Sequence, residues 1–172
     1  MLGQACAQLQ QWHRAGHTDW SMSVTLSPLQ LQDSHLLAHV QDCLDRHQLP
    51  ARQLILEITE STVMRDTQAA LALLNSLSAL GVGIAIDDFG SLLNLKQLPA
   101  TELKLGGNFT HELEPGSNAI TILATIIALG HALDMAVIAD GITTREQRQR
   151  LERMGCDYLQ GQLIGVAVAA QR

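Results

Sequence analysis

Short apolar segments alternate along the chain with segments of helical spacing, and this alternation constrains the fold more than any other feature. Six segments predict strands: 21–26, 54–58, 82–86, 102–105, 135–139 and 158–160. Five segments between them predict helices: 33–47, 66–80, 92–98, 117–133 and 144–154. Strands that alternate with helices indicate a parallel sheet with helical crossovers. The strands are apolar without strict alternation, which is typical of strands covered on both faces.

Polar side chains stand where the predicted strands end. Thr25 lies near the end of the first strand, and the others follow at or just beyond the ends of later strands: Glu57, Glu60, Asp87, Asp88, Lys104, Asp140 and Gln160. Parallel strands place their carboxyl ends on one face, and in a (β/α) barrel that face holds the active site. Carboxylates grouped in this way suit hard cations such as Mg²⁺ and Mn²⁺. A single acid can instead cap the next helix, but acids at successive strand ends favour a functional site.

Composition excludes several classes of function. The chain has 172 residues, 47% of them hydrophobic, so it is long and apolar enough to bury a core as one domain. Its net charge of −6 and its few aromatic side chains argue against nucleic-acid binding, which uses basic patches and stacking platforms.

The cysteines and histidines indicate no metal site. Cys6, Cys43 and Cys156 have no C-x-x-C spacing, so neither a disulfide framework nor a zinc knuckle is indicated. His35 and His39 have the spacing of a zinc chelate, but no glutamate lies between them, so a solvated helix face is favoured.

The longest apolar stretch, residues 119–139, predicts a helix and then a strand, not a membrane span. His131 and Asp134 interrupt the stretch, and Gly130 lies near the break. The first residues, MLGQACAQLQQW, predict an amphipathic helix and lack the basic segment that opens a secretory signal peptide. We therefore expect a cytoplasmic protein without a membrane partner.

Five motifs carry a resemblance to a known family. They are LILEITES (54–61), IAIDDFG (84–90), LPATELKL (98–105), AVIADGITT (136–144) and GCDYLQGQL (155–163). In their order and spacing they resemble the EAL domain family, which hydrolyses the bacterial second messenger cyclic di-GMP on a (β/α) barrel. The resemblance therefore implies a barrel of parallel strands and a role in cyclic di-GMP signalling.

The resemblance also implies a role for each residue at the strand ends. Four residues stand at the family's metal-binding acids: Glu57, Asp87, Asp88 and Asp140. Lys104 and Gln160 match the lysine and glutamine near the attacking water, and Glu60 matches a glutamate that holds the loop after the aspartate pair. The chemistry implied is phosphodiester hydrolysis by two cations, Mg²⁺ or Mn²⁺, that share and activate a water.

Several positions depart from the family pattern. Thr25 replaces a metal-binding asparagine, and a hydroxyl is a shorter and weaker cation ligand than an amide. Asp140 is one methylene shorter than the glutamate of the family, and Gly106 replaces the acid that follows the lysine. The loop after Asp88 is shorter than in the family, and residues 160–167 lack its basic residue and proline. A metal centre built from these residues is expected to bind Mg²⁺ or Mn²⁺ weakly at most.

The signature E-A-L segment of the family is also absent from this sequence. A full (β/α) barrel averages about 250 residues, so a chain of this length supplies about five or six βα units. We therefore expect an α/β fold, an incomplete TIM-like (β/α) barrel of mainly parallel strands that lacks the N-terminal strand or strands of the EAL barrel. Residues 1–172 are expected to form this single truncated EAL-like domain.

These departures predict a degenerate EAL-family protein of cyclic di-GMP signalling that does not hydrolyse the nucleotide. Such a protein would act by binding a protein or a ligand, and cyclic di-GMP itself is one candidate ligand. The alternative is a cyclic di-GMP-specific phosphodiesterase, either weak or part of a longer active enzyme. An incomplete barrel leaves open sheet edges, so we expect a protein partner or a homo-oligomer. The helix from Gly3 to Trp12, with Cys6 and Leu9 on one side, is expected to contribute to association unless it folds inward.

Overall fold

The computed structural model describes residues 1–89, 95–111 and 118–170. Internal contacts divide the chain into two compact units. Unit 1 comprises residues 1–85 and 94–100, and unit 2 comprises residues 86–93 and 101–172. Strand β3 (Gly83–Asp87) runs through the division, so its start belongs to unit 1 and its end to unit 2.

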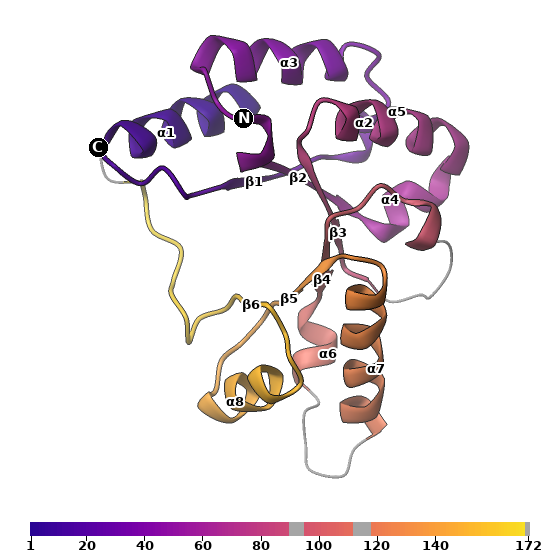
Figure 1. Ribbon diagram of the computed structural model, residues 1–172. Coiled ribbons are helices and arrows are strands. Elements are labelled where there is room, and N and C mark those ends of the chain that lie inside the picture. The colour runs from indigo at the N-terminus through magenta and orange to yellow at the C-terminus, as the bar shows by residue number, and fades with distance from the viewer. Residues whose placement is uncertain (90–94, 112–117, 171–172) are drawn as a thin grey trace. The chain divides into compact units, whose positions relative to one another are not determined.

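Unit 1 contains a pair of parallel strands and the helices that follow them (Figure 1). Strand β1 (Met22–Thr25) pairs with β2 (Leu54–Thr59). The longer helices are α1 (Leu2–Arg14), α3 (Leu36–His47) and α5 (Thr67–Ala79). The shorter elements are α2 (Pro28–Leu31), α4 (Glu60–Arg65) and 3₁₀ turns at Ala51–Gln53 and Leu95–Gln97. Helix α1 packs against α3 and β1.

Local sequence explains where the helices of unit 1 begin. The Ser27 hydroxyl accepts a hydrogen bond from the backbone N–H of Gln30, and the Gln30 side chain accepts one from the N–H of Ser27. This reciprocal capping box turns the chain into α2 directly after β1. The Asp66 carboxylate accepts the N–H of Ala69 and so caps α5. Short polar side chains therefore set the positions of both helices relative to the strands before them.

Unit 2 repeats the same alternation. Strands β4 (Glu102–Leu105), β5 (Ala136–Ala139) and β6 (Tyr158–Leu159) pair in parallel and in chain order. Helices α6 (Gly107–His111) and α7 (Asn118–Ala132) lie between β4 and β5, and α8 (Arg145–Arg153) lies between β5 and β6 (Figure 1). Each parallel pair is thus joined by a helical crossover, as the sequence predicts.

The strands form the core of each unit. Leu54, Leu56 and Ile58 of β2 are fully buried, and Ile55 between them is buried as well. Leu103, Lys104 and Leu105 of β4 are likewise buried in succession. Burial of consecutive residues means that both faces of these strands are covered, which confirms the interpretation of their apolar sequences. A core of this kind leaves the strand ends as the places where polar side chains reach the surface.

The predicted strands all occur, and β4 has the bounds expected from sequence. Helices α2, α4 and α6 were not predicted, because helices of 4, 6 and 5 residues hold too few apolar repeats to show a period. Helix α3 begins three residues later than expected because Asp33 first accepts the N–H of His35 in a local turn. The predicted helix 92–98 lies partly outside the described residues, and its described part is the 3₁₀ turn at Leu95–Gln97.

The apolar stretch 119–139 consists of α7 followed by β5, as predicted. The chain reverses between them at Asp134, which has a left-handed φ of 58°. In the part of the chain that the structure describes, no helix is long and apolar enough to cross a membrane.

Candidate functional site

Thr25 and Glu57 lie together at the ends of neighbouring strands in unit 1. The two residues are register partners in the β1–β2 pair. The Thr25 hydroxyl donates a hydrogen bond of 3.2 Å to Glu57 Oε2, and the N–H of Leu26 donates to the backbone oxygen of Glu57 at 2.8 Å. The threonine that stands in place of a metal-binding asparagine thus directs its hydroxyl proton at the carboxylate expected to bind metal. A donor in that position competes with a cation for the same lone pair.

Glu60 opens α4 directly after β2 and is buried. A carboxylate in the first turn of a helix is stabilised by the partial positive charge of the exposed N–H groups. The predicted role of Glu60 is to hold the loop after Asp88, and residues 90–94 of that loop lie outside the described residues. Glu60 therefore remains a predicted loop-stabilising residue.

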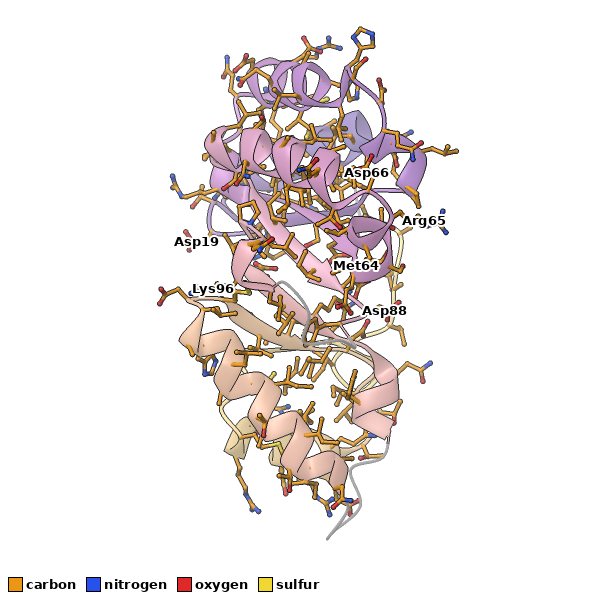
Figure 2. All side chains as sticks on the ribbon, turned by 90° about the vertical axis from the view of Figure 1, so that its right-hand side faces the viewer. Asp19, Met64, Arg65, Asp66, Asp88 and Lys96 are labelled. Atoms are coloured by element: carbon orange, nitrogen blue, oxygen red, sulfur yellow. The ribbon has the colours of Figure 1, made fainter. Side chains whose placement is uncertain are left out.

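An open hollow of about 290 Å³ lies among α2, α4 and α5 of unit 1. Its lining residues are Pro28, Leu31, Gln32, Thr62, Arg65, Asp66, Ala69 and Ala70. Figure 2 shows Arg65 and Asp66 where α4 passes into α5. None of the residues predicted for the site lines this hollow, so it is separate from the strand-end residues of unit 1.

The aspartate pair ends β3 in unit 2, where Figure 2 labels Asp88. Asp88 has a left-handed φ of 53°, and its N–H donates to Asp87 Oδ1 at 2.9 Å. The left-handed conformation is rare for residues other than glycine, although aspartate tolerates it better than most. Beyond it, the N–H of Phe89 approaches the backbone oxygen of Lys104 at 3.4 Å, and the Phe89 side chain is buried. This turn directs the Asp88 carboxylate toward Gly106.

Gly106 leaves the space that the Asp88 carboxylate occupies. A Cβ atom built on Gly106 would lie 2.7 Å from Asp88 Oδ1. Real Cβ atoms do not approach an oxygen so closely, so any other residue at position 106 requires Asp88 to move. The family acid expected at position 106 is therefore incompatible with the position that Asp88 takes in this chain.

Lys104 and Asp140 form an ion pair in unit 2. Lys104 Nζ lies 3.6 Å from Asp140 Oδ2, and the lysine side chain is only 8% exposed. The other carboxylate oxygen, Asp140 Oδ1, accepts the N–H of Gly141 at 2.6 Å. Both oxygens of the carboxylate are thus engaged by groups of the chain itself. A buried ammonium needs such a counter-charge, because burial without one is costly.

Helices α6 and α8 hold the loop that follows Asp140. The buried Thr110 hydroxyl lies 2.7 Å from the backbone oxygen of Asp140 and 3.1 Å from that of Gly107. The Gln147 side chain donates to the backbone oxygen of Thr110 at 3.0 Å and accepts the N–H of Thr144 at 3.0 Å. The loop between β5 and α8 is therefore tied to both helices, which sets where the Asp140 carboxylate lies.

Gln160 follows β6, and its backbone joins two segments. Its N–H donates to the oxygen of Ala139 at 2.8 Å, and its own oxygen accepts the N–H of Ile142 at 3.0 Å. The next residue, Gly161, has a φ of 147° and packs against the Ile142 backbone so closely that a Cβ would collide with it. The Gln160 side chain is exposed. The backbone thus holds Gln160 beside the loop that carries Asp140.

The acids of unit 2 do not gather into a cluster that would hold a metal ion in the described structure. Among the described residues, no group of three or more His, Cys, Asp and Glu is arranged to hold a metal ion. A cation bound at Asp140 would also meet the Lys104 ammonium, which already neutralises that carboxylate. The expected Mg²⁺ or Mn²⁺ site therefore finds no support in the side-chain geometry of this unit.

Sequence reasoning did not anticipate the parts played by Gly106, Thr110 and Gln147. In the sequence, Gly106 shows only the loss of an acid, whereas in the structure it leaves room for the Asp88 carboxylate. Thr144 and Gln147 form a capping box at α8, with the spacing that a search for helix starts detects. Thr110 has no sequence signal, because its contact with Asp140 depends on how α6 folds back on the end of β5.

Comparisons with known proteins agree on one family. Residues 1–167 match the model of the EAL domain. The chain is 46% identical over its whole length to the bifunctional diguanylate cyclase/cyclic di-GMP phosphodiesterase MucR of Pseudomonas aeruginosa, of which it covers 26%. It is 33% identical over 95% of its length to the cyclic di-GMP phosphodiesterase PA2567 of the same species, of which it covers 28%. The chain thus spans about a quarter of the length of these curated relatives.

The fold also matches solved structures. The MucR phosphodiesterase solved in complex with cyclic di-GMP superposes with a TM-score of 0.90 at 46% identity, over 96% of this chain and 68% of that one. This likeness confirms the α/β fold class and the TIM-like barrel. The barrel is incomplete over the described residues, because six parallel strands occur there and a full barrel has eight.

Proposed function

Because the chain belongs to the EAL domain family, we propose that it acts in cyclic di-GMP signalling as a member that binds without hydrolysing the nucleotide. The observation that carries this proposal is the ion pair between Lys104 and Asp140, at 3.6 Å. The pair uses a carboxylate at the predicted metal position to neutralise the lysine that the family places near the attacking water. A lysine and a divalent cation repel each other, so each disfavours the other at this carboxylate.

Two further contacts support the absence of catalysis. Thr25 donates to Glu57, so a hydroxyl proton faces the carboxylate that a metal would use in unit 1. Asp88 packs over Gly106, in the space that a side chain at position 106 would need. Two-metal hydrolysis needs complete ligand shells to lower the pKa of the shared water and to stabilise the in-line transition state. Incomplete sets of metal ligands in both units favour binding of cyclic di-GMP over its hydrolysis.

Phosphodiesterase activity is the second candidate function. It is favoured by the retention of Glu57, Asp87, Asp88, Lys104 and Gln160 at the predicted positions. The names of the relatives MucR and PA2567 include cyclic di-GMP phosphodiesterase, which also favours this candidate. Activity of this kind would require Mg²⁺ or Mn²⁺, and the acids of unit 2 do not gather into a cluster that would hold a metal ion in the described structure.

Cyclic di-GMP is the ligand that we propose for the binding function. The MucR phosphodiesterase was solved in complex with it, and this chain superposes on that structure. The exposed Gln160 side chain, whose amide can both donate and accept hydrogen bonds, is chemically suited to a guanine edge. We place the protein in the cytoplasm, where such a nucleotide messenger is expected.

We also propose that the chain binds a protein partner or a second copy of itself. Helix α1 does not offer its apolar side to such a partner, because Cys6 and Leu9 are fully buried against its own unit. Exposed apolar side chains instead lie near the end of the chain, at Ile164, Val166 and Val168. Several exposed apolar side chains in one short segment favour association. Light scattering of the purified chain and of an Ile164→Asp/Val166→Asp variant tests this, and a monomeric mass for both would refute it.

Hydrolysis and binding are separated by one pair of measurements on the whole chain. Cyclic di-GMP is incubated with the protein in Mn²⁺ or Mg²⁺, and the linear dinucleotide is followed by chromatography with the MucR phosphodiesterase in parallel. We expect no linear product from this chain, together with saturable binding by calorimetry in the presence of a metal chelator. Product that forms at a catalytic rate and disappears in Asp87→Asn would establish the phosphodiesterase instead. Absence of both binding and product would refute the proposed ligand.

A further inference from the structure

Cys6 and Cys43 face each other across two helices of unit 1. Helices α1 and α3 lie side by side (Figure 1), and Gln10 of α1 donates a 2.7 Å hydrogen bond to the backbone oxygen of His47 in α3. Cys6 and Cys43 each lie four residues before those partners, which is about one helical turn. The Gln10–His47 bond therefore fixes a parallel register in which the two cysteines stand opposite one another.

The two thiols are buried and interact. Cys6 is 0% exposed and Cys43 is 5% exposed. Burial raises the pKa of Cys6 most, and the neighbouring Cys43 thiol raises it further. Helices packed about 8–10 Å apart bring facing Cα atoms within reach of the roughly 4.4–6.8 Å that a disulfide spans.

The surroundings of Cys43 distinguish it from Cys6. His39 lies one turn earlier in α3, with its Nε2 atom 3.8 Å from Cys43 Sγ. Burial raises the pKa of both thiols, with Asp42 adding to the effect at Cys43 and Arg46 opposing it. Cys43 is thus the more accessible thiol, and an imidazole lies beside it. These features make Cys43 the better nucleophile of the pair.

We propose that Cys6 and Cys43 form an oxidation site, a dithiol that closes to a disulfide between α1 and α3 by exchange with a small-molecule disulfide such as oxidised glutathione. Cys43 loses its proton to His39 or water, and its thiolate attacks the glutathione disulfide and releases one glutathione thiolate. Cys6 then loses its proton, and its thiolate attacks Cys43 Sγ and releases the second glutathione thiolate. Two glutathione thiols and one protein disulfide are formed, so protons and electrons balance.

The site has two measurable properties that follow from burial. Reaction requires local opening of α1 from α3, and the thiolate is scarce at neutral pH, because burial raises the pKa of Cys6 to about 11. Closure is therefore slow at neutral pH and accelerates as the pH rises. Once closed, the disulfide joins α1 covalently to α3 until a thiol reduces it, and it does not depend on any residue of the proposed nucleotide site.

Cys156 serves as the internal control. It belongs to unit 2, its thiol lies 3.3 Å from the backbone oxygens of Val137 and Tyr158, and burial raises its pKa to about 11 as well. No second cysteine is present in unit 2, since the chain has only three. Cys156 therefore resembles Cys6 in acidity and differs from it in lacking a facing thiol.

The test is a redox titration of the full chain. The protein is equilibrated with mixtures of reduced and oxidised glutathione, quenched in acid, unfolded, alkylated and weighed intact. We expect a species that has lost two hydrogen atoms and carries one alkyl group, with a Cys6–Cys43 cross-link in its peptide map. Cys156→Ser should retain the cross-link, whereas Cys43→Ser should lose it.

The wild-type peptide map decides the matter even if a cysteine variant fails to fold. Three alkylated thiols at every glutathione ratio would refute the proposal. Stable glutathione adducts on Cys43 without a cross-link would also refute it, as would a disulfide that involves Cys156. Thermal unfolding adds an independent readout, because the cross-linked species should unfold at a higher temperature than the reduced protein and Cys43→Ser should lose that increment.

Discussion

Asp88 Oδ1 lies 2.7 Å from the position that a Cβ atom on Gly106 would occupy. The absence of a side chain at position 106 and the left-handed backbone of Asp88 are therefore two parts of one arrangement. Gly106 has no side chain, and the Asp88 carboxylate occupies the space that a side chain there would need.

Replacing Gly106 with alanine should displace the Asp88 carboxylate at a cost of less than about 1 kcal/mol, because the atom in the way is the end of an exposed, flexible side chain. Urea unfolding measures the change in the free energy of unfolding. Gly165→Ala is the matched control in the same unit, since nothing lies within 4 Å of a Cβ built there. A loss of more than about 1 kcal/mol in Gly106→Ala alone would show that the Asp88 carboxylate cannot move aside.

Replacing Lys104 with methionine should cost about 1–3 kcal/mol of stability and leave Asp140 without its cation. The estimate lies below the cost of breaking a fully buried pair because the Asp140 side chain is 35% exposed. Arg46→Met is the control, since it removes a cation from the exposed pair with Asp42 and should change stability by less than about 1 kcal/mol.

The same Lys104→Met variant tests the competition between lysine and metal. Mn²⁺ binding, followed by the electron paramagnetic resonance signal of the free ion, should be tighter in Lys104→Met than in the wild type. Weaker or unchanged binding would contradict the idea that the ammonium excludes a cation from Asp140.

Replacing Thr110 with valine should destabilise the protein by about 1–3 kcal/mol, because the buried backbone oxygen of Asp140 loses its hydroxyl donor. Thr110→Ser keeps the hydroxyl and should recover most of the stability. Thr125→Val is the control, since the Thr125 hydroxyl binds the oxygen of Thr121 on an exposed turn of α7 and its loss should be nearly neutral. Thermal unfolding of the three variants tests the contact.

Asp157 should make stability depend on acid pH. The N–H of Val137 donates to its carboxylate at 2.7 Å and, with His131 at 2.8 Å, lowers its pKa below the ordinary value of 3.8. A lowered pKa in the folded state contributes stability above the unfolded pKa, and this contribution is lost as the pH falls from about 3.8 through the folded value.

The substitution Asp157→Asn should therefore reduce stability at neutral pH, by about 1 kcal/mol or less because the side chain is 38% exposed. The difference from wild type should shrink as the pH falls below 3.8. Asp19→Asn, at an exposed residue, is the control. Urea unfolding at a series of pH values measures the difference, and a gap that stays constant with pH would contradict this account.

The sequence by itself determined the strands, the longer helices and the family, because these depend on patterns within short segments. The bounds of β4 were predicted correctly, and the apolar runs of β2 and β4 indicated strands covered on both faces. Motif order then indicated the family, and the parallel topology predicted that the site residues lie at or near the carboxyl ends of the strands. The apolar pattern of each segment and the order of the motifs are properties of the sequence itself and do not depend on how the chain packs.

Tertiary structure alone decided how those site residues use their side chains. The Lys104–Asp140 pair, the packing of Asp88 over Gly106 and the Thr110 bond to Asp140 join residues from different strands and helices. Cys6 and Cys43 likewise meet only because α1 and α3 pack in one register. No local pattern predicts such contacts, because they depend on the register of packed elements. The ion pair of Lys104 and Asp140 is therefore visible only in the folded chain, since the two residues lie on different strands.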